Sequence, residues 1–129
     1  MANNGYSVKV RESSKTLTAR EKLMFSDTTN AVKLDDIVTP DNALTITPAD
    51  YVILFVHNEN SENQDYDVYV IITDDGKKYI TGSSSFWNSF SDIWDVMHED
   101  ETAEPYQIEI FKKESKNFKG KYFLTCSVI

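Results

Sequence analysis

The chain has 129 residues, enough for one domain with a hydrophobic core. Its composition, 40% hydrophobic and 26% charged, is that of a globular protein, and no apolar run approaches the roughly 20 residues of a membrane span. The single cysteine, Cys126, excludes an internal disulfide and disfavours a structural zinc site. Because the first residues, MANNGYSVKV, also lack the pattern of a signal peptide, we expect a protein of the reducing cytoplasm without a membrane partner.

Charge is segregated along the chain, although the formal net charge is −8. Residues 1–33 carry a net charge of +3, residues 34–104 carry −14, and residues 105–129 carry +3. A polyanion responds to a local basic patch more than to the total charge. If the two ends of the chain meet in space, they form one basic face on an acidic body. Otherwise these charges are an ordinary solvated surface.

The first third of the chain combines short extended segments with turns. Residues 1–14 are polar with a brief alternation, which indicates an edge strand or a flexible arm. The segment Leu17–Phe25 alternates like a strand but also has good helix propensity, and we expect a strand because strand-like segments dominate the rest. After a turn at 26–30 we expect a short strand at 31–34, a loop at 35–43 and another short strand at 44–46.

Two apolar runs mark the central strands. Tyr51–His57 and Tyr66–Thr73 are rich in β-branched and aromatic residues, which is typical of strands buried on both faces. The polar segment 58–65 is expected to join them as a hairpin. A tight turn at Asp75-Gly76 then leads to a short strand at Lys78–Thr81, since Asp-Gly supplies the positive φ angles that such a turn needs.

One helix is expected at Ser83–His98. The serines at its start are good N-caps. Apolar residues then recur at spacings of three and four, so they share one face of the helix. These residues are Phe86, Phe90, Ile93, Trp94 and Met97.

The last stretch, Pro105–Ile129, is expected to form two strands joined by a basic turn. The first strand has one apolar face, whereas the second, Lys121–Ile129, is apolar on both faces and is therefore expected to be covered on both sides, as in a closed barrel. The turn, residues 112–121, contains five lysines and Phe118. The whole pattern predicts one mainly β domain over residues 1–129, with a helix that covers one face or one end of a small antiparallel barrel.

No motif indicates catalysis. The two histidines, His57 and His98, follow no ligand spacing, and Cys126 is expected in the core of its apolar strand. The paired acids lie in turns or loops, and the chain has neither a glycine-rich phosphate loop nor a nucleophile elbow. We therefore expect a protein that is not an enzyme, with no metal, cofactor or small-molecule substrate.

The residues favour binding of single-stranded nucleic acid. This function needs cations along the backbone path and exposed aromatic faces on which bases stack. Phe118 is the strongest stacking candidate because it lies between Lys116 and Lys119 in a turn; the alternative is that its ring packs on the base of the hairpin. The candidate binding residues are Arg20, Lys22, Tyr69, Tyr79, Phe111, Lys112, Lys113, Lys116, Phe118, Lys119, Lys121 and Tyr122, with Lys9, Arg11 and Lys15 as further cations.

The order of motifs from residue 68 onward resembles a known family. A strand end at Asp75-Gly76 precedes a serine-led amphipathic helix, Ser83–Met97, and a Ser-Lys-x-Gly-type turn, Ser115–Gly120, joins two terminal strands. This pattern resembles the small single-stranded-DNA-binding proteins of protein-primed tailed bacteriophages, which coat displaced strands during replication. The first half of the chain matches only in its strand pattern, and the chain departs from the family in its acidity and its longer N-terminus.

The resemblance implies an OB-like, oligonucleotide-binding barrel. It also implies a protein of the bacterial host cytoplasm that binds and protects single-stranded DNA with little sequence preference. The setting would be replication or recombination of a phage or mobile element, with phage or host replication proteins as further partners. The charge pattern leaves an alternative open: residues 34–104 form an acidic protein-interaction module, a DNA mimic or inhibitor of a host nucleic-acid enzyme.

Overall fold

The computed structural model describes residues 5–100 and 104–129, which form two compact units. The first unit contains Met1–Val32 and Asp50–Gly82, and the second contains Lys33–Ala49 and Ser83–Ile129. Each unit is built around one sheet, so the expectation of a mainly β chain is confirmed.

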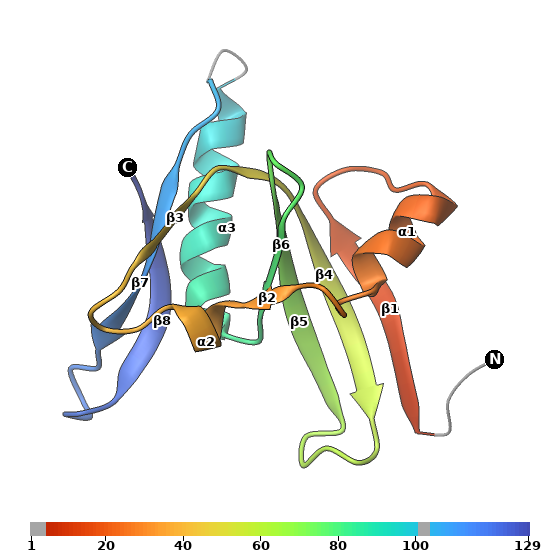
Figure 1. Ribbon diagram of the computed structural model, residues 1–129, viewed down its shortest axis with the longest axis horizontal. Coiled ribbons are helices and arrows are strands. Elements are labelled where there is room, and N and C mark those ends of the chain that lie inside the picture. The colour runs from red at the N-terminus through yellow and green to blue at the C-terminus, as the bar shows by residue number, and fades with distance from the viewer. Residues whose placement is uncertain (1–4, 101–103) are drawn as a thin grey trace. The chain divides into compact units, whose positions relative to one another are not determined.

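The sheet of the first unit has five strands in the order β1-β4-β5-β6-β2 (Figure 1). The N-terminal alternation forms its edge strand, which pairs antiparallel with β4. The predicted Asp-Gly turn joins β5 to β6, with Gly76 at a φ of 84°, a value that glycine adopts without steric cost. The strands are β1 (Tyr6–Ser13), β2 (Val32–Lys33), β4 (Pro48–Asn58), β5 (Asp65–Thr73) and β6 (Lys78–Thr81).

One face of this sheet carries the core of the first unit. Alternate residues of the two central strands, Val52 and Leu54 on β4 and Val70 and Ile72 on β5, are buried together with Leu17. Residues that alternate along a strand share one face, so the periodicity of the two central runs places these side chains together. Phe25, from the segment between β1 and β2, packs against the same cluster.

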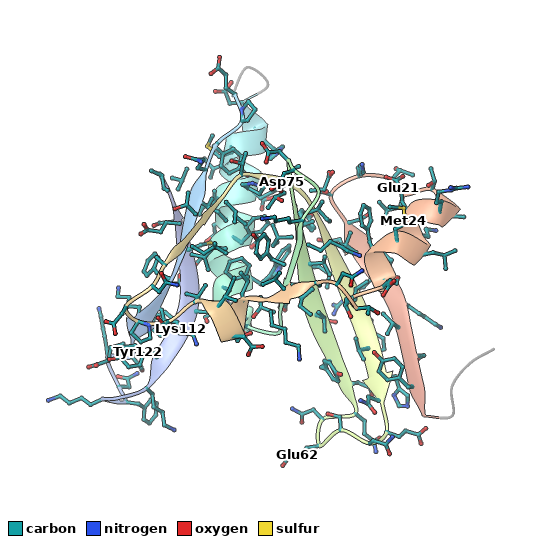
Figure 2. All side chains as sticks on the ribbon, viewed as in Figure 1. Glu21, Met24, Glu62, Asp75, Lys112 and Tyr122 are labelled. Carbon is teal, nitrogen blue, oxygen red and sulfur yellow. The ribbon has the colours of Figure 1, made fainter. Side chains whose placement is uncertain are left out.

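The segment expected as a strand at Leu17–Phe25 is instead a helix, α1 (Ala19–Ser26), so that prediction was wrong. Its start is a capping box: the Glu21 backbone N–H donates to Thr18 Oγ1 at 3.2 Å, and the Thr18 N–H donates to Glu21 Oε1 at 3.1 Å. Leu23 is 76% exposed and Met24 55% exposed, so the alternation there does not reflect burial. Figure 2 labels Glu21 and Met24 on this helix.

The second unit is a three-stranded antiparallel sheet with two helices. Its strand order is β3 (Leu44–Ile46), β7 (Ile108–Glu114) and β8 (Tyr122–Val128). The segment expected as a loop at 35–43 begins with a single-turn helix, α2 (Leu34–Ile37). The expected terminal hairpin is confirmed by the pairing of β7 with β8.

The predicted amphipathic helix is confirmed as α3 (Ser84–Glu99). The Ser83 hydroxyl caps it by accepting a hydrogen bond from the Phe86 N–H at 3.1 Å. The apolar face buries Phe86 and Phe90 completely. The helix lies along β8. The Ser85 hydroxyl donates to the Leu124 carbonyl at 2.8 Å, and the Ser89 hydroxyl lies 2.8 Å from the Thr125 hydroxyl.

In the described part of the chain neither sheet closes on itself, so the expected OB-like barrel is not confirmed. The expectation that both faces of the last strand are covered was also wrong. Leu124 and Cys126 are buried on one face, but Phe123 and Ser127 are exposed on the other. Apolar residues often remain on a protein surface, so an apolar outer face is weak grounds for a second covering layer.

The core of the second unit yields a stability prediction. Phe90 is fully buried, and its ring centroid lies 5.8 Å from that of Phe86, 5.6 Å from that of Trp87 and 5.8 Å from that of Trp94. We expect Phe90→Ala to lower the free energy of unfolding by about 3–5 kcal/mol, because it removes a buried ring and leaves a cavity. Urea unfolding followed by circular dichroism measures the change.

The matched control is Val96→Ala on the same helix, where the side chain is 65% exposed. This change should alter the free energy of unfolding by no more than about 0.5 kcal/mol. Equal effects of the two substitutions would contradict the packing of α3.

Candidate nucleic-acid interface

The hairpin tip, defined here as residues Lys113–Phe123, is the end of the β7–β8 hairpin. The Ser115 N–H donates to the Lys121 carbonyl at 2.8 Å, and the Lys121 N–H donates to the Phe118 carbonyl at 3.1 Å, which closes the turn. Gly120 has a φ of 81°, a backbone conformation that is costly for residues with a side chain. The backbone of the tip is therefore held by the pairing of the strands and by a glycine at the required position.

The tip presents aromatic rings to solvent. Phe118 is 62% exposed, Tyr122 47% and Phe123 36%. The Lys121 ammonium lies 5.7 Å from the centroid of the Phe118 ring, within the range of a cation–π contact. The alternative that Phe118 packs on the base of the hairpin does not fit its exposure. Phe118 thus offers a ring for stacking beside a positive charge.

The strand register determines how these side chains are grouped. Lys113 lies opposite Phe123, and Glu114 lies opposite Tyr122, so each pair shares one face of the hairpin. Phe123 was not predicted from the sequence, although its position opposite Lys113 follows once the register is known. On the face opposite the buried Leu124 and Cys126, the tip therefore has the Phe123 ring and Lys113 side by side.

Lys112 has a different role from the lysines of the tip. It lies opposite the buried Leu124, and its ammonium donates a hydrogen bond to the Asp35 carbonyl of α2 at 3.2 Å. Figure 2 labels Lys112 and Tyr122 at this end of the two strands. Lys112 thus joins the hairpin to α2.

Within the described ranges, two cations of the N-terminal segment have carboxylate partners that the lysines of the tip lack. Arg11 forms an ion pair with Asp67 at 2.5 Å, and the Lys15 ammonium lies 3.2 Å from Glu21 and 3.5 Å from Asp50. These carboxylates offset the charge that an anionic ligand would need. Among the described residues, no carboxylate forms an ion pair with the four tip lysines, which are Lys113, Lys116, Lys119 and Lys121.

The other predicted residues are distributed over both units. Arg20 and Lys22 are exposed on α1 of the first unit, so the structure does not gather them with the tip in one compact unit. A single basic face made by both chain ends stays a prediction. In the first unit Tyr69 is half-buried on β5, and Tyr79 on β6 is only 7% exposed, so its ring is not presented to a base. Phe111 on β7 is half-buried.

The titratable side chains considered for catalysis have structural partners. His57 Nδ1 lies 2.6 Å from the Asp65 carboxylate, and this hydrogen bond raises the pKa of His57 above its ordinary value. His98 stacks on Trp94 with ring centroids 3.9 Å apart. In the part of the chain that the structure describes, no group of three His, Cys, Asp or Glu side chains is arranged to hold a metal ion. No described helix has both the length and the apolar character to cross a membrane.

Comparison with protein-family models, curated proteins and solved structures finds no match to this chain. The resemblance to single-stranded-DNA-binding proteins of bacteriophages therefore stays a prediction.

Cys126 is expected to be chemically inert in the folded protein. It is 6% exposed on β8, and burial raises the pKa of its thiol to about 12. Because the thiolate is the reactive form, iodoacetamide at neutral pH should leave native Cys126 unmodified but should alkylate it in urea. Mass spectrometry after timed quenching measures the two rates. Equal rates would show that β8 does not bury this thiol.

Proposed function

We propose that the protein binds single-stranded DNA through its hairpin tip, with little sequence preference, in the replication or recombination of a phage or mobile element. The observation that carries this proposal is the exposed ring of Phe118 among four lysines that form no ion pair with a described carboxylate. Aromatic faces and unpaired cations are the two requirements for binding a flexible polyanion whose bases are unstacked.

The chemistry of the tip favours binding without sequence readout. Lysine ammonium groups contact phosphates as point charges, and a phenyl ring stacks on any base because every base has a π face. If each of the four tip lysines neutralises one phosphate, the logarithm of affinity falls with the logarithm of salt concentration with a slope of about −3. A steeper slope would require further cations, such as Arg20 and Lys22 of the first unit.

Charge reversal at the tip tests the electrostatic half of the proposal. The variant Lys116→Glu/Lys119→Glu should lower the affinity for oligothymidylate at least about tenfold at about 50 mM NaCl, because two phosphate contacts become repulsive. Fluorescence anisotropy of a labelled oligonucleotide measures the affinity, and circular dichroism confirms that the variant is folded.

The control is Lys33→Glu/Lys77→Glu, which makes the same change in net charge at two exposed lysines outside the tip. It should retain most of the affinity. A loss as large as that of the tip variant would place the interface elsewhere. A folded wild-type protein that binds no single strand at low salt would overturn the proposal and favour the acidic interaction module.

Removal of one ring tests the stacking half of the proposal. Phe118→Ala should weaken binding by about 1–3 kcal/mol, because a base loses its stacking partner, and should leave the salt slope unchanged, because no cation is removed. Phe118→Tyr should keep most of the affinity, since it preserves the aromatic face. The control Leu23→Ala removes an exposed apolar side chain from α1 and should have no effect.

The two measurements on Phe118→Ala separate stacking from charge. An unchanged affinity would mean that the ring does not contact DNA. A shallower salt slope would mean that the substitution has displaced the neighbouring lysines.

A further inference from the structure

The second unit carries an apolar groove at the end of β8 opposite the hairpin tip. It has a volume of about 270 Å³ and is lined by Asp92, Ile93, Val96, Met97 and Val128. Val96 is 65% exposed and Val128 is 49% exposed, so the groove opens to solvent. Its walls belong to the second unit alone.

The placement of α3 produces this groove. The hydroxyls of Ser85 and Ser89 bind β8 at Leu124 and Thr125, so the first half of the helix is tied to the middle of the strand. The second half of α3 continues beside the end of β8, where Val128 is reached (Figure 1). Side chains three and four positions apart on a helix share a face, which brings Ile93, Val96 and Met97 together there.

Carboxylates flank the groove on one side. Asp92 lines it, and Asp95 and Glu99 follow at spacings of three and four residues, so the three share a stripe on α3. All three side chains are exposed. They lie in the half of the helix whose carbonyl end is the negative pole of the helix dipole, which adds to the local negative potential.

We propose that the groove binds the hairpin tip of a second copy of this chain. Phe118 of one copy would enter the groove of the next, with Lys116 and Lys119 facing Asp92, Asp95 and Glu99. A cavity of about 150 Å³ is enough to hold benzene, so about 270 Å³ accommodates a phenylalanine ring. An apolar groove with a carboxylate stripe is complementary to an exposed ring with flanking lysines in polarity and charge.

The tip cannot occupy the groove of its own unit. The two features lie at opposite ends of β8, whose seven residues span about 20 Å. The contact therefore joins two different surfaces of two copies. A reciprocal pair of such contacts about a two-fold axis builds a dimer, whereas a contact that is not reciprocated builds a ring when the rotation closes and an open chain when it does not.

This assembly does not rest on the proposed function, but it uses the same tip residues. A tip that occupies a neighbouring groove is not available to DNA. Self-association and DNA binding therefore compete for the tip, and single-stranded DNA should dissociate the assembly into monomers.

Sedimentation velocity measures the weight-average mass at concentrations up to about 1 mM, a range that detects weak contacts. At about 50 mM NaCl without DNA, the weight-average mass of the wild-type protein should increase with protein concentration to at least about twice the monomer mass of 14.8 kDa. The mass should fall back at about 0.5 M NaCl, since exposed charges are then screened. Phe118→Ala should lower the mass at about 50 mM NaCl, because the ring no longer fills the groove.

A charge swap identifies the contact. The tip variant Lys116→Glu/Lys119→Glu and the groove variant Asp92→Lys/Asp95→Lys should each stay monomeric, because like charges then meet. An equimolar mixture should assemble, since each reversed surface meets its complement on the other variant. The control Asp41→Lys/Glu62→Lys makes the same change in net charge as the groove variant at exposed positions and should assemble like the wild type.

Three results would overturn the proposal: a wild type that remains at 14.8 kDa throughout, a tip or groove variant that assembles normally, or a mixture of folded variants that stays monomeric. The groove variant also separates the two proposals, because its acids lie outside the DNA-binding tip. It should lose self-association and keep DNA binding. Self-association without any DNA binding in the wild type would overturn the proposed function alone.

Discussion

The antiparallel pairing of β7 with β8 is the constraint on which both proposed binding surfaces of this protein depend. Side chains along a strand point alternately to its two faces. A shift of the β7–β8 register by one residue would therefore expose Leu124 and Cys126 and bury Phe123. The buried face fixes the register, and the register then decides which lysine stands beside which ring. The arrangement of side chains at the exposed tip therefore depends on which residues of the hairpin are buried.

The helix α3 extends the same constraint to the far end of the strand. Its hydrogen bonds from Ser85 and Ser89 fix it beside β8, and its buried rings of Phe86 and Phe90 provide the apolar area that holds it there. The helix continues beyond these contacts, and its last turns leave apolar side chains uncovered next to Val128. One strand and one helix thus carry a basic aromatic surface and an acidic apolar surface.

Sequence patterns predicted the local elements of this fold well where two signals agreed. The helix at α3 combined serine caps with an apolar face, and the Asp75-Gly76 turn combined a required backbone angle with flanking strands. At α1 the signals disagreed: alternation favoured a strand, whereas the Thr18–Glu21 capping box, which was overlooked, favoured the observed helix. The closed barrel was inferred from apolar residues on β8 that turned out to lie at the surface.

The candidate interface was predictable in part. The lysines and Phe118 of the hairpin form one local segment, so their clustering follows from the turn. The loss of Arg11 and Lys15 to ion pairs with Asp67, Glu21 and Asp50 depends on strand pairing and helix placement, which local patterns do not contain. The groove could not be predicted from the sequence for the same reason, since it requires α3 to lie beside the end of β8.

The distance between the two ends of β8 separates the basic hairpin tip from the carboxylates of α3. Across about 20 Å of strand, the far carboxylates lie about two screening lengths from the tip, because the Debye length is about 10 Å at 0.1 M ionic strength. An approaching phosphate chain therefore responds to the tip lysines more than to the net charge of −8. The same separation leaves the acidic end free to attract cations independently, so one unit can have two surfaces of opposite charge.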